Sequence, residues 1–367
     1  MPTKLPEFRT TGEVGERRRS RHYRRCLRSQ VPHKHLFTFD YTGQVFLLLH
    51  QWRSGEHFFA FLLCATVVGS VSSASGESAK LLRIGYQKSG VFLLLRNEGS
   101  LEKKFAPLGY AIEWREFSYG SPILEALSGG SIDVGHSGDA PVIFAQAAGI
   151  PFVYIAATDE SPASAGVVVR KNSPIQNFGE LRGKTIAFAK GSSSHHLVAQ
   201  LLTRAGMTFN DIKPAYLQPA DARAAFESGT IDAWAIWDPF LAAAELDGDG
   251  RVIATGAGFN GHREYYFARK EFLAAHPEVV APLLAALVEV GVKAKRDPKA
   301  TADFLAGKLG ISAAVMERSE YRKQRYNARP LDGGIIQEQQ EAADTFHRLG
   351  LIPLEIKVSE NVYQGPP

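Results

Sequence analysis

Two segments of the chain place serine residues where a short apolar run, typical of a strand, passes into a stretch with helical spacing. The first is IDVGHSGDAPVIFAQAAG, residues 132–149, and the second is TIAFAKGSSSHHLVAQLL, residues 185–202. The first turn of a helix has backbone N–H groups without intrahelical partners and lies at the positive end of the helix dipole. Small polar residues there form a binding site for an oxyanion. The two segments together predict one anionic ligand held from two sides.

Both segments supply candidate donors to such a ligand. The expected set is Ser137, Gly138 and Asp139, the last through its backbone N–H, together with Ser192, Ser193, Ser194 and His195. The alternative for Ser137 and Ser192 is a role as helix N-caps alone, which serine fills often.

Five further residues are candidates because of their place at the end of an expected strand or turn. Gln87 ends the run at 81–86, and Asp238 precedes Pro239, which is expected to open a helix that Asp238 caps. Trp234 and Trp237 lie in DAWAIW, where strand alternation puts one ring toward the cleft and the other toward the core. A cleft-facing indole would hold an alkyl tail. Tyr265 is a candidate for the rim or hinge.

Apolar runs rich in Val and Ile alternate with helical spacing from residue 81 onward. The expected strands are residues 81–86, 111–117, 132–137, 152–158, 166–171, 185–190, 212–217, 232–237, 251–256 and 265–270. This alternation occurs twice along the chain, first at residues 81–171 and again from residue 185, and each time it predicts a mainly parallel α/β sheet. Helices are expected at residues 192–205, 220–227, 276–295, 298–309 and 334–349.

The order of elements predicts two lobes joined by two crossings. Residues 80–168 form the first part of lobe 1, residues 169–260 form lobe 2, and residues 261–367 return to lobe 1 with C-terminal helices. Ligand sites in open α/β sheets lie at the carboxyl ends of strands, where both serine segments stand.

Residues 1–79 differ from the rest of the chain. The apolar run HFFAFLLCATVVGSV, residues 57–71, follows Arg53 and precedes SSASGESA. This layout is typical of a secretory signal peptide with cleavage after Ala74. Because about fifty residues precede the run, we expect an over-extended translation start; a genuine basic, disordered tail is the alternative. The isolated Cys64 within the run is interpreted as apolar filler, not a lipid-attachment site.

Charge and cysteine usage also separate the two parts. Residues 1–79 hold 11 basic and 6 acidic residues, so the remaining 288 residues carry a net charge of −1 although the chain as a whole carries +4. This balance gives no indication of nucleic-acid binding. Both cysteines, Cys26 and Cys64, lie in the first part, so the rest can form no disulfide.

Catalytic motifs are incomplete in this sequence. GHSGD, residues 135–139, comes near the nucleophile elbow but has Asp139 where glycine belongs, and GSSSH, residues 191–195, fails at the same position. A secreted serine hydrolase using Ser137 or Ser193 remains the alternative from another class. No P-loop, zinc motif or dinucleotide fingerprint is present, so no cofactor or metal is expected.

Four stretches carry a resemblance to a known family. LRIGYQK at 82–88, GSIDVGHSGDAPVIFAQAAG at 130–149, KGSSSHHL at 190–197 and PADARAAFESGTIDAWAIWDPF at 219–240 resemble the periplasmic aliphatic sulfonate-binding proteins of ABC importers. The resemblance covers about residues 81–355 and is specific when the four stretches are taken in order.

The resemblance implies a two-lobed type II periplasmic-binding-protein fold without enzymatic activity. It implies a monomer that closes on an organic sulfonate and delivers it to an inner-membrane ABC permease for sulfur acquisition. Binding proteins for taurine, nitrate or a thiamine-precursor pyrimidine are the alternatives within this class. A sulfonate stays ionised and presents three equivalent oxygens, which N–H and O–H donors at helix starts satisfy without a buried Lys or Arg.

Overall fold

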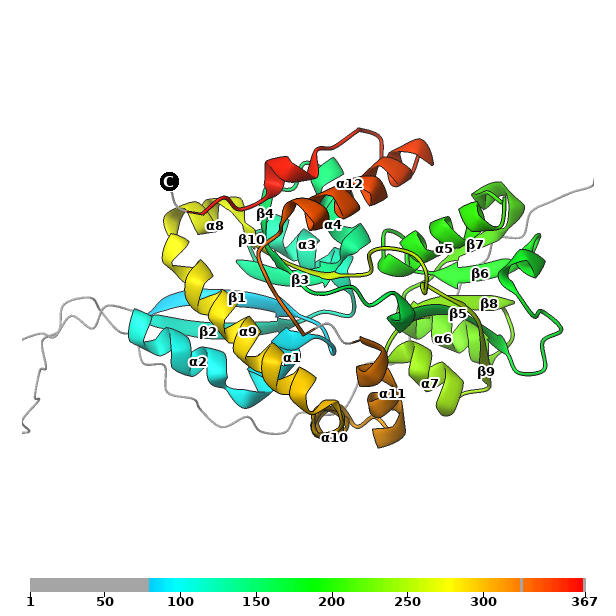
Figure 1. Cartoon of the computed structure of the whole chain (residues 1–367), viewed down its shortest axis with the longest axis horizontal. Helices are drawn as coiled ribbons and strands as arrows, with labels where there is room; N and C mark the ends of the chain where they lie inside the picture. Colours follow the sequence, from blue (N-terminus) through cyan, green and yellow to red (C-terminus); the bar gives the residue numbers. More distant parts are fainter. Residues whose placement is uncertain (1–78, 324–325, 366–367) are drawn as a thin grey trace, which may run out of the picture. The chain divides into compact units, whose positions relative to one another are not determined.

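Two five-stranded mixed sheets organise the part of the chain that the computed structural model describes, residues 79–323 and 326–365 (Figure 1). The expected basic leader, signal peptide and cleavage after Ala74 lie outside these residues. Among the described helices, none is long and apolar enough to cross a membrane.

The first sheet has the strand order β2-β1-β3-β10-β4. Its strands are β1 (Lys80–Tyr86), β2 (Tyr110–Glu116), β3 (Val134–Gly138), β4 (Phe152–Ala157) and β10 (Glu264–Arg269). The second sheet has the order β7-β6-β8-β5-β9. Its strands are β5 (Ala165–Arg170), β6 (Thr185–Phe188), β7 (Lys213–Tyr216), β8 (Ala233–Trp237) and β9 (Gly250–Thr255). We call the parts built on these sheets lobe 1 and lobe 2.

Each sheet contains one antiparallel strand, so the expectation of mainly parallel sheets holds with one exception per lobe. β10 runs antiparallel to β3 and β4, and β5 runs antiparallel to β8 and β9. These are the two strands by which the chain enters a lobe from the other lobe. The chain passes between the lobes on the side where the parallel strands end. β5 and β10 therefore begin on that side and run antiparallel to the other strands of their sheets. The expected boundary at 168/169 falls inside β5.

Helices cover both faces of each sheet (Figure 1). Lobe 1 begins with α1 (Val91–Glu98), α2 (Ser100–Phe105), α3 (Gly120–Ser128) and α4 (Asp139–Ala147). Lobe 2 has α5 (Ser193–Arg204), α6 (Pro219–Glu227) and α7 (Phe240–Leu246). The C-terminal helices are α8 (Lys270–Ala275), α9 (Val280–Arg296), α10 (Pro298–Leu309), α11 (Ala313–Lys323) and α12 (Gly333–Arg348).

Strand alternation divides the core of lobe 1 into two layers. Tyr265 and Phe267 of β10 pack with α3, α4 and α12, whereas Tyr266 and Ala268 pack with α1 and α9 on the other face. Lobe 2 is divided in the same way, with α5 on one face of its sheet and α6 and α7 on the other. Because both faces are buried, the strands read as nearly continuous apolar runs.

The helix α11, which was not among the expected elements, joins the C-terminal part of the chain to lobe 2. It packs against α7, and Arg318 of α11 forms an ion pair with Glu245 of α7 at 3.2 Å. Arg322, near the end of the same helix, contacts Glu245 at 2.5 Å. The C-terminal segment therefore touches both lobes beside the gap between the two sheets.

Candidate ligand-binding site

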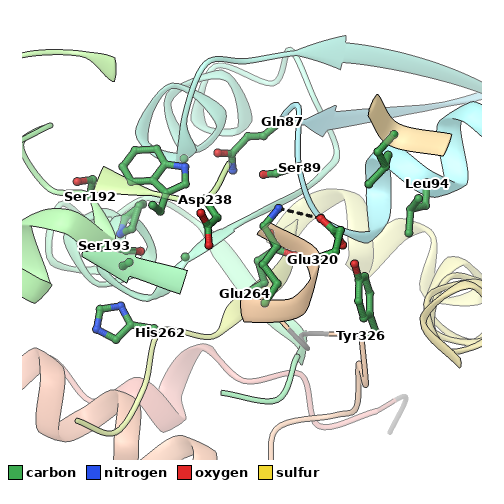
Figure 2. A pocket seen from close by; sticks show the side chains of 18 residues that line it. Gln87, Ser89, Leu94, Ser192, Ser193, Asp238, His262, Glu264, Glu320 and Tyr326 are labelled. Carbon is green, nitrogen blue, oxygen red and sulfur yellow. Dashed lines mark hydrogen bonds and ion pairs between the residues drawn. The ribbon is translucent and has the colours of Figure 1, made fainter. Parts of the chain in front are cut away.

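A cavity lies between the carboxyl ends of the two sheets and holds about 800 Å³ of empty space, including the part that opens to solvent (Figure 2). Lobe 1 contributes Gln87, Gly120 and Gly138 to its wall, and lobe 2 contributes Ser192, Ser193 and Trp237. The C-terminal helices close one side of it. The cavity is thus built from segments that are far apart in the sequence.

Four helix N-termini meet at this cavity. Gly90, Gly138 and Ser192 are the N-caps of α1, α4 and α5, Gly120 is the first residue of α3, and all four line the cavity wall. Each helix directs free N–H groups and the positive end of its dipole toward its start. The carboxylate of Glu264 lies against Gly90, where an added Cβ would come within 2.6 Å of Oε1. The starts of α3, α4 and α5 form the rest of this positive wall.

Gly138 and Ser193 bring the two lobes into direct contact at the cavity. A Cβ added to Gly138 would overlap with Ser193 Oγ, so a side chain at position 138 would displace this hydroxyl at the contact between the lobes. The Ser193 hydroxyl also contributes, after the charge and hydrogen bond of His196, to the lowered pKa of Asp139. The structure is therefore closed at this edge, with the expected donors of lobe 1 and lobe 2 side by side.

Ser192 has two roles in the structure. Its Oγ accepts a hydrogen bond from His195 N–H at 3.3 Å and donates one to the Ala189 carbonyl at 2.7 Å, so it caps α5. The same residue lines the cavity. The N-cap role weighed from the sequence is therefore present, and it fixes the backbone of the helix start that faces the cavity.

Asp139 anchors the start of α4 to lobe 2 and does not line the cavity with its side chain. Its carboxylate accepts a hydrogen bond from Ala140 N–H at 2.9 Å and pairs with His196 Nδ1 of α5 at 2.6 Å. Burial raises the pKa of Asp139, but the charge and hydrogen bond of His196 outweigh it and hold this pKa well below its usual range. A buried hydrogen-bonded pair thus crosses the lobe interface behind the serine contacts.

Gln87 and Asp238 lie at the cavity wall, as the sequence positions suggested (Figure 2). Trp237 lines the same wall. Gln87 N–H donates to His136 Nε2 at 3.3 Å, which orients the end of β1. Trp237 lines both this cavity and a second groove that Phe117, Pro219 and Phe240 also line. Asp238 Oδ1 accepts from Ala242 N–H in the first turn of α7 at 3.0 Å, but α7 begins at Phe240 and its N-cap residue is Pro239, not the expected Asp238.

Besides that of Asp139, the side chains of five further candidate residues do not reach the cavity wall. Ser137, Ser194, His195, Trp234 and Tyr265 are at most 1% exposed, and none lines the cavity. Successive residues of a helix or strand point in different directions, so only one or two residues at each element's end face the gap. Ser137 Oγ donates to the Gly138 carbonyl at 3.0 Å beneath Gly120. Trp234 packs against Phe226 in the lobe 2 core.

His195 belongs to an aromatic cluster of the core. Its ring stacks on Phe188 with centroids 5.1 Å apart and contacts Phe144, Phe209 and Tyr216. Its Nδ1 accepts a hydrogen bond from Gly191 N–H at 3.1 Å. Burial, with smaller contributions from the charges of His196 and Lys190, lowers the pKa of His195 to about 4. Tyr265, expected at the rim, instead packs on Tyr154 in the lobe 1 core.

Five charged or aromatic residues of the cavity wall were not among the sequence candidates: His262, Glu264, Glu320, Lys323 and Tyr326. Glu320 and Lys323 lie on α11, three residues apart, and both are buried although they are charged. Lys323 Nζ donates to Glu320 Oε1 at 3.3 Å. The signal that could have found them is a Glu and a Lys three residues apart on the apolar face of a helix, where such residues are buried almost only as a pair.

No group of three or more metal-ligating side chains is found among the described residues. Two α/β lobes joined by two crossings, with a cavity between the carboxyl ends of their sheets, are the features of a type II periplasmic binding protein. The fold and the cavity thus place the chain in this class of two-lobed solute-binding proteins. The helix N-termini of the two lobes make the wall of this cavity favourable to an anion.

Comparisons with known proteins give the family. The NMT1/THI5 like family model matches residues 109–301. The putative aliphatic sulfonates-binding protein of Escherichia coli (strain K12) is 37% identical over 297 residues, which cover 81% of this chain and 93% of the relative. The chain belongs to this family of aliphatic sulfonate-binding proteins.

Solved structures agree with this assignment. The alkanesulfonate-binding protein SsuA from Xanthomonas axonopodis pv. citri, bound to MOPS, is 37% identical with a TM-score of 0.74, over 77% of this chain and 98% of that one. The periplasmic aliphatic sulphonate binding protein SsuA from Escherichia coli has a TM-score of 0.71 at 37% identity, over 78% of this chain and 93% of that one.

Proposed function

We propose that this protein is a periplasmic receptor that captures aliphatic sulfonates and delivers them to an ABC importer for sulfur acquisition. The observation that carries the proposal is the convergence of the α3, α4 and α5 N-termini with Gln87, Ser192 and Ser193 on one cavity. A sulfonate stays ionised at every physiological pH, and its three oxygens accept the N–H and O–H donors that this wall presents.

The alkyl tail has an aromatic wall beside the headgroup site. Trp237 is partly exposed where the cavity and the outer groove meet, and Phe240 lies 6.3 Å from it in an edge-to-face arrangement. Contact with an aromatic face does not depend on the exact shape of the tail. The site therefore suits a range of tail lengths.

The serine hydrolase alternative receives no support from the geometry. A serine nucleophile needs an imidazole as its base. Ser137 donates to the Gly138 carbonyl, and no imidazole is hydrogen-bonded to Ser193 among the bonds of the described residues. The nearby His196 directs Nδ1 to Asp139, not to a serine. We infer that the protein binds its ligand without chemical change, as a monomer and without a cofactor or nucleic acid.

Delivery to an importer requires export. The sequence interpretation of residues 57–74 as a signal peptide supports a periplasmic location. N-terminal sequencing of the protein from a periplasmic extract tests this, with a mature start at Ser75 expected. Recovery only from the cytoplasm with an uncleaved leader would contradict it.

Calorimetric titration with matched anions tests the function itself. Pentane-1-sulfonate should bind, whereas hexanoate, with a planar headgroup of two oxygens on a similar tail, should bind at least tenfold more weakly. The same protein should leave a chromogenic ester unchanged. Equal affinity for both anions, or ester turnover that Ser193→Ala abolishes, would contradict the proposal.

A further inference from the structure

The third parallel strand of each lobe lies in a sequence segment that occurs twice in the chain. GSIDVGHSGDAP, residues 130–141, and GTIDAWAIWDPF, residues 229–240, start 99 residues apart and share a Gly, an Ile and two Asp residues at the same positions. β3 and β8 occupy the same place in the two segments. The first glycines, Gly130 and Gly229, both have a positive φ, of 67° and 78°. The two lobes are therefore built on one local pattern at the strand that ends at the cavity.

Asp139 and Asp238 hold the same position in the two segments, as the first residue after the strand. Both are at most 2% exposed. Each carboxylate accepts a hydrogen bond from a backbone N–H of the helix that follows, that of Ala140 at 2.9 Å and that of Ala242 at 3.0 Å. A carboxylate buried to this extent needs a basic partner, because such residues are almost never fully buried unpaired.

Each aspartate has a basic partner from the other side of the gap between the lobes. Asp139 of lobe 1 pairs with His196 of lobe 2 at 2.6 Å. Asp238 of lobe 2 pairs with Arg322 of α11, whose Nη1 lies 3.5 Å from Oδ1. α11 belongs to the lobe 1 side, because Met316 of this helix lies in the lobe 1 core together with the buried residues of α10. The two pairs thus connect the lobes in opposite directions.

Arg322 is held so that its guanidinium contacts α7 near both ends. Besides Asp238, which precedes α7, it contacts Glu245 near the end of that helix, with Nη2 2.5 Å from Oε2. The Arg322 carbonyl accepts a hydrogen bond from Ser161 Oγ at 2.8 Å, in the first crossing between the lobes. A planar guanidinium presents donors to two carboxylates at once, which a single ammonium group does not.

The cavity lies between the two pairs. The pair of Asp139 lies behind the serine contact of the lobes, whereas Figure 2 shows Asp238 between Ser193 and Glu320 of α11. Lys323, the residue after Arg322, also lines the cavity. The end of α11 therefore contacts the cavity on one side and α7 on another.

We propose that Arg322 is a positioning residue that clamps lobe 2 to α11 when the lobes close on the ligand, as the counterpart of His196 at the equivalent aspartate. This inference rests on the proposed function for its ligand and goes beyond it by naming a residue that controls ligand release. α11 is anchored in the lobe 1 core by an apolar side chain and meets α7 through the ion pairs of Arg318 and Arg322. Polar contacts of this kind are typical between domains that move relative to each other.

A clamp that forms only in the closed protein affects one rate constant of binding. The ligand enters the open form, in which the clamp is absent, so kon does not depend on it. The ligand leaves only after the lobes reopen, so breaking the clamp is part of dissociation and its loss raises koff. A residue that only supports the fold would instead change the unfolding midpoint and leave koff as it is.

Stopped-flow fluorescence of the full chain with pentane-1-sulfonate measures both rate constants, with Trp237 of the cavity wall as the reporter. Arg322→Met keeps an unbranched side chain and removes the charge. We expect koff to rise about tenfold or more, since an ion pair of the buried Asp238 is lost in the closed form, and kon to stay within about twofold.

Arg318→Met is the matched control. Arg318 lies one turn earlier in α11 and also pairs with Glu245, at 3.2 Å, but its side chain is 45% exposed. Among the described residues it forms no ion pair with Asp238. Its loss should change koff by less than about twofold, as is typical of a surface pair.

The outcomes separate the clamp from other roles of Arg322. A folded Arg322→Met protein with unchanged koff would overturn the inference, as would an equal rise of koff in the Arg318 variant. A fall in kon alone, or a lower urea midpoint without a change in koff, would assign Arg322 to the fold and overturn it too. An unaltered protein that does not bind pentane-1-sulfonate would count against the proposed function and, with it, this inference.

Arg322→Lys tests the inference even if the methionine variant does not fold. Lysine retains the positive charge, but its single ammonium group cannot pair with Asp238 and Glu245 together. We expect koff to rise about threefold or more above that of the unaltered protein. A koff equal to that of the unaltered protein would overturn the clamp.

Discussion

His196 Nδ1 of lobe 2 lies 2.6 Å from the Asp139 carboxylate of lobe 1, and both side chains are at most 4% exposed. This pair exists only when the lobes are together, because each residue belongs to a helix of a different lobe. Ligand binding and the pair are therefore expected to stabilise the same closed form.

A double-mutant cycle tests the coupling of this pair to ligand binding. Asp139→Asn and His196→Gln should each weaken alkanesulfonate binding about tenfold or more, because each leaves a buried partner without compensation. The double variant should lose less than the sum of the two effects, with a coupling of about 1 kcal/mol or more. Calorimetry measures all four proteins.

The exposed pair Arg223 and Glu227 of α6 provides the control cycle. Its coupling should be a few tenths of a kcal/mol at most, as is typical of surface pairs, and binding should not change. Strictly additive effects of the Asp139 and His196 substitutions would contradict the role of the pair in closure.

Gly138→Ala tests the contact between the lobes at the cavity. The backbone φ of Gly138 is −69°, so alanine fits the local conformation and acts only through its methyl group. The methyl group overlaps with Ser193 Oγ in the closed form, which typically costs about 1–3 kcal/mol. We expect sulfonate affinity to fall roughly five- to 150-fold with little change in the unfolding midpoint of the ligand-free protein.

Gly307→Ala is the matched control for this substitution. Gly307 lies in α10 and an added Cβ meets no other atom within 4 Å. Alanine should leave affinity unchanged and stabilise the helix by up to about 1 kcal/mol. Unchanged affinity of the Gly138 variant would show that the two lobes do not meet there when ligand is bound.

Trp237→Ala should flatten the dependence of affinity on tail length. Each methylene that is buried contributes about 0.8 kcal/mol, and the indole wall supplies part of that contact. Titration with propane-, pentane- and heptane-1-sulfonate should show a smaller gain per carbon than in the unaltered protein. Phe304→Ala, at a side chain exposed on α10, should leave the gain as it is.

His195 gives the stability of the protein a defined pH dependence. Its pKa falls from 6.5 to about 4 on folding, so the unfolded chain binds the proton more strongly. Stability from this residue is present above pH 6.5 and is lost as the pH falls toward 4, by about 3 kcal/mol at most. The lowered pKa of Asp139 extends the loss below its unfolded value near 3.8.

Urea unfolding between pH 7.5 and 4.5 measures this dependence. His195→Asn keeps an acceptor for Gly191 N–H but removes the titrating ring, so its stability should vary much less over this range. A variant that loses stability as steeply as the unaltered protein would show that other groups cause the loss.

The order of strands and helices was predictable because apolar periodicity is a local property. The strand ends at Gly138 and Phe188 and the helix starts at Asp139 and Ser193 lie within a few residues of the expected positions. The antiparallel direction of β5 and β10 was missed, because a run such as Val167–Val169 looks the same in either direction. Only the path of the chain between lobes fixes it.

The sequence predicted serine donors of the candidate site but not the charged residues that line it. Ser192 and Ser193 face the cavity, whereas Ser194 and His195, one and two residues further along the helix, turn into the core. Glu320 and Lys323 reach the cavity from α11, more than 120 residues away along the chain. No local pattern connects them with the serine segment, since tertiary packing alone brings them together.

The central claim is that a hydroxyl donor of lobe 2 and helix starts of lobe 1 bind the same sulfonate headgroup. The most direct test is calorimetric titration of pentane-1-sulfonate into Ser193→Val, with the exposed Ser359→Val as the control. We expect the first substitution to weaken binding by about 1.5–3 kcal/mol, roughly ten- to a hundred-fold, and the second to leave it unchanged. A correctly folded Ser193→Val protein that binds the sulfonate with undiminished affinity would contradict that arrangement.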